Sequence, residues 1–89
     1  GARREMFESY IKRLQELEEL SVGFEGVEKA YALRAGREVR VIIDSNETDD
    51  NKTFMISKNI AKKIQEDMEY PGQIKVTVIR EIRATEYAK

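Results

Sequence analysis

The chain has no cysteine, no histidine and no tryptophan, and it contains a single proline. Without cysteine there is no disulfide framework and no thiolate chemistry, a composition that suits a reducing compartment without requiring one. Without cysteine and histidine, the common ligand sets for zinc and iron are missing, and so is the imidazole that most often serves as a general base. We therefore expect no catalysis from this chain alone.

An excess of one charge and a long apolar run are missing as well. The 16 basic and 17 acidic side chains nearly cancel, so no overall field draws the chain toward nucleic acid or a membrane, and any basic patch must be local. No apolar run approaches the roughly 18 residues that a membrane-spanning helix needs, and no signal-peptide pattern opens the sequence. At 89 residues, the chain is expected to be one soluble domain with a thin core.

The first amphipathic pattern covers residues 4–20. Apolar side chains recur there at steps of three and four, which predicts a helix with one apolar stripe. Gly23 and Gly26 signal its end, because glycine adopts the left-handed conformation that closes a helix without steric strain. The stripe consists of Phe7, Tyr10, Ile11, Leu14, Leu17 and Leu20.

A second helix is predicted over residues 53–68, where apolar side chains recur at steps of four. The polar segment before it offers several caps, and the helix must stop before Pro71 because the residue preceding proline is pushed out of the helical region. The stripe consists of Ile56, Ile60, Ile64 and Met68, and the candidate caps are Asp49, Asp50 and Asn51.

Two extended stretches, residues 27–35 and 38–44, are separated only by Gly36 and its charged neighbours. This spacing predicts a hairpin with a tight turn, in which glycine supplies a positive φ. A phosphate-binding loop would instead need further glycines, or a lysine and a hydroxyl leading into a helix.

Alternation assigns the faces of the strands. A third strand is predicted within residues 72–83. In the first strand Val27, Tyr31 and Leu33 share one face, opposite Ala30 and Ala32. In the second, Val39, Val41 and Ile43 alternate with Arg40 and Ile42, and in the third, Ile74, Val76, Val78 and Ile82 alternate with Lys75, Thr77, Ile79 and Glu81.

The order helix, strand, strand, helix, strand predicts the α+β class. We expect a two-layer α-β-β-α-β domain with a small three-stranded sheet, mixed or antiparallel, whose strand order stays open. Ile42 and Ile79 fall on the outer sheet face, where a solvated surface would be polar. Either the first helix or a partner is expected to cover that face.

Six basic residues on and near the strands form a candidate surface for RNA or a partner. Such cations can contact phosphate, but no exposed aromatic rings are interleaved with them for base stacking. Ion pairs with Glu28, Glu38 and Glu81 are the interpretation that we favour over a binding role. The six are Arg34, Arg37, Arg40, Lys75, Arg80 and Arg83.

Several blocks of the sequence occur in the same order in a known family. They are GARRE at 1–5, FEGVEKAYA at 24–32, AGREVR at 35–40, IAKKI at 60–64, YPGQIKVTVIRE at 70–81 and EYAK at 86–89. On these blocks the chain resembles, over essentially its whole length, the C-terminal region of bacterial ribonuclease Y.

The resemblance implies that residues 1–89 are a single C-terminal domain of a longer protein. That parent would be a metal-dependent endoribonuclease (a hydrolase) that initiates messenger RNA decay. It would have an N-terminal membrane anchor, a coiled coil, a KH domain and an HD phosphodiesterase domain before this one. The divalent metal and the catalytic cluster would belong to the HD domain, so no cofactor, metal ligand or catalytic residue is expected here. The domain would lie on the cytoplasmic side and make no membrane contact itself.

Two hypotheses follow for the role of the domain. The one that we favour is a non-catalytic structural and interaction module that packs on the nuclease core or mediates self-association as a homodimer, with Ile42 and Ile79 as its packing face. The alternative is an auxiliary RNA-binding surface that feeds substrate toward the HD site. Replacing Arg40 and Lys75 should then weaken binding to many RNA sequences. Other RNA-decay proteins would be partners only through the parent.

Overall fold

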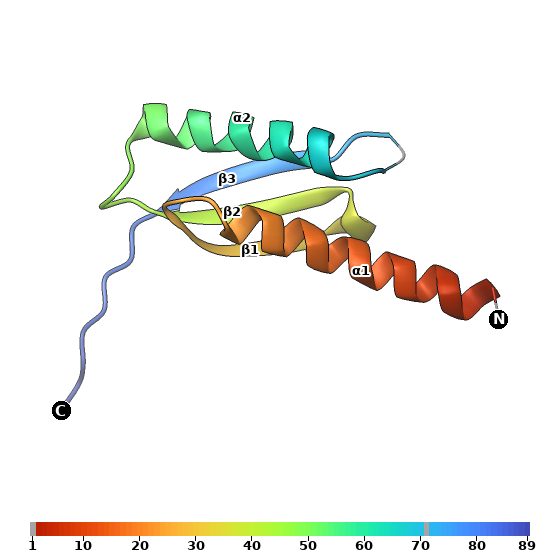
Figure 1. Cartoon of the computed structure of the whole chain (residues 1–89). Coiled ribbons are helices and arrows are strands. Elements are labelled where there is room, and N and C mark those ends of the chain that lie inside the picture. The colour runs from red at the N-terminus through yellow and green to blue at the C-terminus, as the bar shows by residue number, and fades with distance from the viewer. Residues whose placement is uncertain (1, 71) are drawn as a thin grey trace.

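Two helices and three strands follow one another in the predicted order. The computed structural model describes residues 2–70 and 72–89. Residues 82–89 follow the last strand without regular secondary structure and extend away from the domain (Figure 1). The predicted α-β-β-α-β fold is confirmed. Its elements are α1 (Ala2–Val22), β1 (Val27–Leu33), the short turn η1 (Arg34–Gly36), β2 (Glu38–Asp44), α2 (Asp50–Asp67) and β3 (Lys75–Glu81).

The three strands form one mixed sheet in the order β1-β2-β3. β1 and β2 are antiparallel and joined by η1, whereas β2 and β3 are parallel and joined through α2. β2 is therefore the central strand. Figure 1 shows α1 alongside β1 and α2 alongside β3.

One face of the sheet is covered by both helices. Alternate residues of β2 are fully buried, and they meet buried side chains of α1 and α2 in one apolar cluster. Because alternate strand residues share a face, the two helices lie on the same side of the sheet, and the domain has the two predicted layers. The cluster consists of Leu17 on α1, Val39, Val41 and Ile43 on β2, and Ile56, Ile60 and Ile64 on α2.

Both helices follow the predicted stripes, with small shifts at their ends. α1 extends beyond the predicted range at each end. Phe7, which was predicted for its stripe, lies outside the residues whose side chains the structure describes. α2 begins earlier than residue 53 because Asp49 caps it, accepting a hydrogen bond from the amide of Lys52 at 2.7 Å. It ends before Pro71, which itself lies outside the described residues.

The connection between β1 and β2 is the tight turn predicted from Gly36. Arg34, Ala35 and Gly36 have positive φ values of 52°, 58° and 81°. Gly36 is also buried, and a Cβ atom there would lie 3.1 Å from the Leu14 side chain of α1. Glycine is thus required both by the left-handed backbone and by the close approach of α1. The predicted hairpin is confirmed.

A bulge at the start of β1 changes the predicted faces of that strand. The register shifts between Val27 and Lys29, so Val27 pairs with Ile43 on the covered side. Tyr31 pairs with Arg40 and points to the other side. One extra residue in a strand reverses the alternation that precedes it. The prediction that Val27 and Tyr31 share a face was therefore wrong.

The second face of the sheet is covered by neither helix in the described part of the chain. Ile42 and Ile79 lie on it, as predicted, and they are in register with each other on β2 and β3. α1 packs on the opposite side, so it does not cover them. We call this surface the open sheet face. It consists of Lys29, Tyr31 and Leu33 on β1, Glu38, Arg40, Ile42 and Asp44 on β2, and Lys75, Thr77, Ile79 and Glu81 on β3.

β3 ends earlier than its apolar pattern suggests. Ile82, which was predicted on the inward face, is 88% exposed and follows the last strand residue, Glu81. The inward position at this end belongs to Arg80, which pairs with Ile43 of β2. A cation fits there because its guanidinium reaches Asp50 at the start of α2, with Nη1 and Oδ1 2.6 Å apart.

Candidate interaction surfaces

A buried carboxylate organises the hairpin end of the open sheet face. Glu38 is only 2% exposed. Arg34 Nε lies 3.2 Å from its Oε1, and Arg40 Nη2 lies 3.3 Å from its Oε2. The hydroxyl of Thr77 on β3 donates a hydrogen bond to Oε2 at 3.2 Å. This carboxylate therefore fixes the positions of two arginines.

The Glu38 carboxylate is held ionised. Burial raises its pKa. Hydrogen bonds from Thr77 and Arg40, together with the charges of Arg40 and Lys75, have a larger combined effect in the opposite direction. The pKa of Glu38 therefore lies below its ordinary value of 4.5.

Two of the six predicted basic residues lie at the far end of the strands. Arg80 is on the helix-covered side and pairs with Asp50, so it does not belong to the open sheet face. Arg83 lies beyond β3, with Nη2 2.7 Å from Glu81 Oε2 and 3.9 Å from Glu28 Oε2. The hydrogen bond with Glu81 and the charges of Glu81 and Glu28 raise the pKa of Arg83. The six cations therefore do not form one continuous patch.

The other four basic residues gather at the hairpin end. Arg34 and Arg40 are both paired with Glu38. Arg37, just before β2, and Lys75, the first residue of β3, are neighbours, since the Lys75 amide donates to the Arg37 carbonyl at 2.8 Å. Within the described residues, neither of these two side chains has a carboxylate at ion-pair distance. The binding role of this set stays a prediction.

The apolar part of the open sheet face consists of Tyr31, Ile42 and Ile79. Tyr31 is 45% and Ile79 38% exposed, and Ile42 is half-buried. The alternation pattern identified the two isoleucines and missed Tyr31, because the bulge precedes it and no residue type marks that bulge. The packing role of these side chains stays a prediction.

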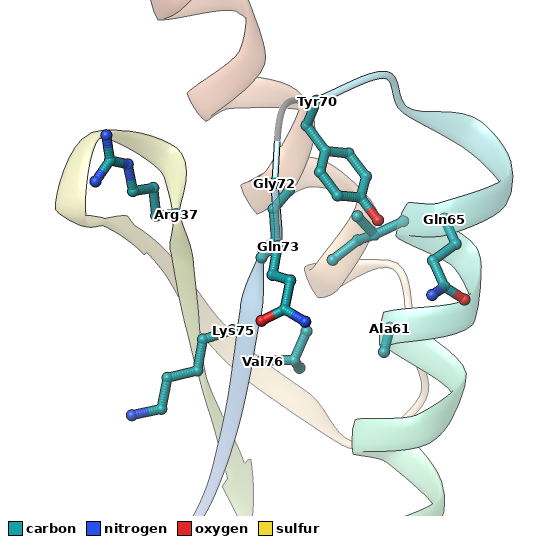
Figure 2. Close-up of a pocket in the computed structure, with 10 residues that line it drawn as sticks. Arg37, Ala61, Gln65, Tyr70, Gly72, Gln73, Lys75 and Val76 are labelled. Atoms are coloured by element: carbon teal, nitrogen blue, oxygen red, sulfur yellow. The ribbon is translucent and has the colours of Figure 1, made fainter.

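A groove opens where the hairpin turn, the start of β3 and the end of α2 meet (Figure 2). We call it the hairpin-end groove; its volume is about 530 Å³. In Figure 2, Tyr70 and Gln73 face the space beside α2, where Gln65 lies. Arg37 and Lys75 are at the rim, and their side chains extend away from that space on the other side of β3. The sequence pattern did not reveal it, because parallel pairing of β2 and β3 brings its walls together. The remaining lining residues are Ala61, Ile64, Gly72, Ile74 and Val76.

The described residues offer few groups for chemistry. No three carboxylate, histidine or cysteine side chains among them are grouped so that they could hold a metal ion. Glu28, Glu38 and Glu81 contact arginines instead. In the same part of the chain, no helix combines the length and the apolar character needed to cross a membrane.

Over its whole length the chain is similar to ribonuclease Y proteins of bacteria. It is 58% identical over 89 residues to "Ribonuclease Y" of Clostridium novyi, which is 100% of this chain and 18% of that relative. It is 57% identical to "Ribonuclease Y" of Nitratidesulfovibrio vulgaris and 56% identical to that of Geotalea uraniireducens, in each case over 100% of this chain and 17% of the relative.

The chain matches the C-terminal part of ribonuclease Y. The resemblance seen in its sequence blocks is thereby confirmed. The chain spans less than a fifth of the length of these ribonuclease Y relatives. No family model matches it, and no solved structure does so either.

Proposed function

We propose that this chain is a non-catalytic packing domain of a bacterial ribonuclease Y-type endoribonuclease, and that its open sheet face docks on the nuclease part of the same enzyme. The observation that carries the proposal is that Tyr31 and Ile79 are exposed, with half-buried Ile42 beside them, on a sheet whose opposite face already holds both helices. Apolar side chains grouped on one exposed surface are typical of a site where another surface packs.

The groups available for chemistry support a non-catalytic role. The sequence contains neither histidine nor cysteine. The buried carboxylate of the open sheet face, Glu38, is neutralised by Arg34 and Arg40. A carboxylate held by two cations has a lowered pKa and is a poor general base. RNA cleavage, the divalent metal and membrane attachment would then belong to other parts of the enzyme.

We propose the nuclease part of the same enzyme as the partner of the open sheet face because the relatives are much longer than the chain. The matched segment makes up 17% of the ribonuclease Y of Nitratidesulfovibrio vulgaris. In such a protein, the remaining part of the polypeptide, more than four fifths of its length, is tethered to this domain. A tethered surface meets its partner at a high effective concentration, so a modest apolar area suffices for docking. A free second copy lacks that advantage.

The test is a chimera in which this chain replaces the matching part of Clostridium novyi ribonuclease Y, which is 58% identical to it. Hydrogen–deuterium exchange of the strand amides is measured in the chimera and in the free chain. We expect slower exchange in the chimera, because docking shields the sheet. The double variant Ile42→Asp/Ile79→Asp is expected to restore the exchange of the free chain.

Met55→Asp is the matched control, because Met55 is an exposed apolar residue (60%) on α2, away from the open sheet face. It should leave the protection of the strands unchanged. Equal exchange in the chimera and the free chain would contradict docking. If light scattering instead shows a dimer of the free chain that the double variant dissociates, a second copy replaces the nuclease part as the occupant.

A further inference from the structure

The hairpin-end groove has two cations whose charges are not neutralised by ion pairs in the described residues. Arg34, Arg40, Arg80 and Arg83 each contact a carboxylate, whereas Arg37 and Lys75 do not. Both of these residues border the groove. Figure 2 shows them on the side opposite Tyr70, with their charged ends directed outward. The outer rim of this wall is therefore a place where an anionic group would be attracted.

The part of the groove beside α2 has groups of the kinds that can contact nucleobases. Figure 2 shows the Tyr70 ring and the Gln73 amide facing the space between β3 and α2, with Gln65 on α2 beside them. Aromatic rings stack on unpaired bases, and a primary amide both donates and accepts hydrogen bonds, as base edges require. One nucleotide presents a phosphate and a base together, which are the groups that the cationic rim and the side chains beside α2 would contact.

The groove also has space for a ligand beside its backbone. Gly72 lies between Tyr70 and Gln73 at a φ of 77°, and a Cβ atom there would have no neighbour within 4 Å. The volume of about 530 Å³ lies within the range of small-molecule sites. Apolar side chains, among them Ile64 and Val76, line its inner part and would exclude water from the face of a bound base.

We propose that the hairpin-end groove binds a nucleotide of single-stranded RNA, with its phosphate on Arg37 and Lys75 and its base against Tyr70, next to Gln65 and Gln73. The choice of RNA rather than single-stranded DNA rests on the proposed function. The assignment of the phosphate and base contacts rests on the residues of the groove. The site takes Lys75 from the hairpin end of the open sheet face and uses none of the apolar side chains Tyr31, Ile42 and Ile79.

The test measures fluorescence anisotropy of a labelled single-stranded RNA of about ten nucleotides, a length typical of small single-strand-binding folds. It is titrated with the whole chain at low and moderate salt. We expect saturable binding that weakens with salt. In the double variant Arg37→Gln/Lys75→Gln, affinity should fall about tenfold or more, and the salt slope should decrease by about 0.7 for each phosphate that the variant no longer neutralises.

The matched control is Lys12→Gln/Lys58→Gln, which removes the same charge from two exposed positions on α1 and α2. Its affinity should stay within about twofold of the unaltered chain. Tyr70→Leu should weaken binding roughly fivefold or more, because a stacking surface is removed, whereas Tyr70→Phe should keep it. Far-UV circular dichroism establishes that each variant is folded.

Three outcomes would overturn the proposal. The first is no saturable binding at low salt. The second is an equal loss in the groove variant and the lysine control, which would indicate general charge attraction. The third is that inorganic polyphosphate displaces the labelled RNA as readily as unlabelled RNA does, while Tyr70→Leu binds RNA with unchanged affinity. The groove would then be a phosphate site only. Ile42→Asp/Ile79→Asp should retain RNA affinity, so failure of this proposal and failure of the docking proposal are distinguishable.

Discussion

The two faces of the central strand β2 have opposite surroundings. On one side, Val39, Val41 and Ile43 are fully buried between both helices. On the other side, Ile42 is half-buried and Arg40 is exposed, beside a carboxylate held by ion pairs. The first face holds the domain together by apolar burial. The second contributes less to folding and is therefore available to a partner.

An isoleucine-to-alanine substitution on each face of the sheet should show the largest difference, because the two faces contribute differently to the free energy of unfolding. Ile60→Ala on α2 removes a fully buried side chain from the core and should lower the free energy of unfolding by about 2–5 kcal/mol. Ile79→Ala on the open sheet face, where the side chain is 38% exposed, should lower it by less than about 1 kcal/mol. Urea denaturation followed by circular dichroism gives both values. Equal losses would mean that the two faces contribute alike to stability.

Two glycines with a left-handed backbone test how tightly α1 packs on the covered side of the sheet. Gly36→Ala should destabilise the chain by about 1–3 kcal/mol more than Gly72→Ala. Both positions have positive φ, but a Cβ atom at Gly36 would press on Leu14 of α1, whereas at Gly72 it would meet nothing within 4 Å. Gly72→Ala is thus the control for backbone strain alone. Similar unfolding midpoints for the two variants would show that α1 can move away from the turn.

The smallest effect is expected at Glu38 and depends on pH. Because its folded-state pKa is lowered below 4.5, ionised Glu38 stabilises the fold at pH values above 4.5, and this contribution is lost as the pH falls through the folded-state pKa. Glu38→Gln should therefore be less stable than the unaltered chain at neutral pH, and the difference should shrink in acid. Urea midpoints measured at several pH values test this. If the difference in urea midpoint between the two proteins grew in acid, the pKa of Glu38 would be raised by folding and not lowered.

The fold could be predicted because the patterns that define it are local. The steps of four in Ile56, Ile60 and Ile64, and the alternation in β2, each reflect burial on one side of a single element. The hairpin followed from Gly36, whose positive φ is a property of the turn itself. These features require no knowledge of what lies across from them.

The surfaces were predicted less well because they depend on pairing between elements. The bulge between Val27 and Lys29 decides on which face Tyr31 lies, and no residue type announces it. Arg80 was grouped with the other cations, but the register of β3 turns it toward the helices. The hairpin-end groove exists only because Lys75 is placed beside Arg37 by the parallel strands.

The parallel pairing of β2 with β3 also determines when the domain can be completed during synthesis. α1 and the hairpin involve residues no later than Asp44, but β3 reaches β2 only after all of α2 has been made. Closing so long a loop lowers chain entropy before the two strands can pair, so β3 is expected to join late. Until then, a nascent chain leaves one edge of β2 unpaired. The arrival of the last strand creates the hydrogen bond from Thr77 to Glu38, the register of Ile42 with Ile79 and the groove beside Arg37 in a single step.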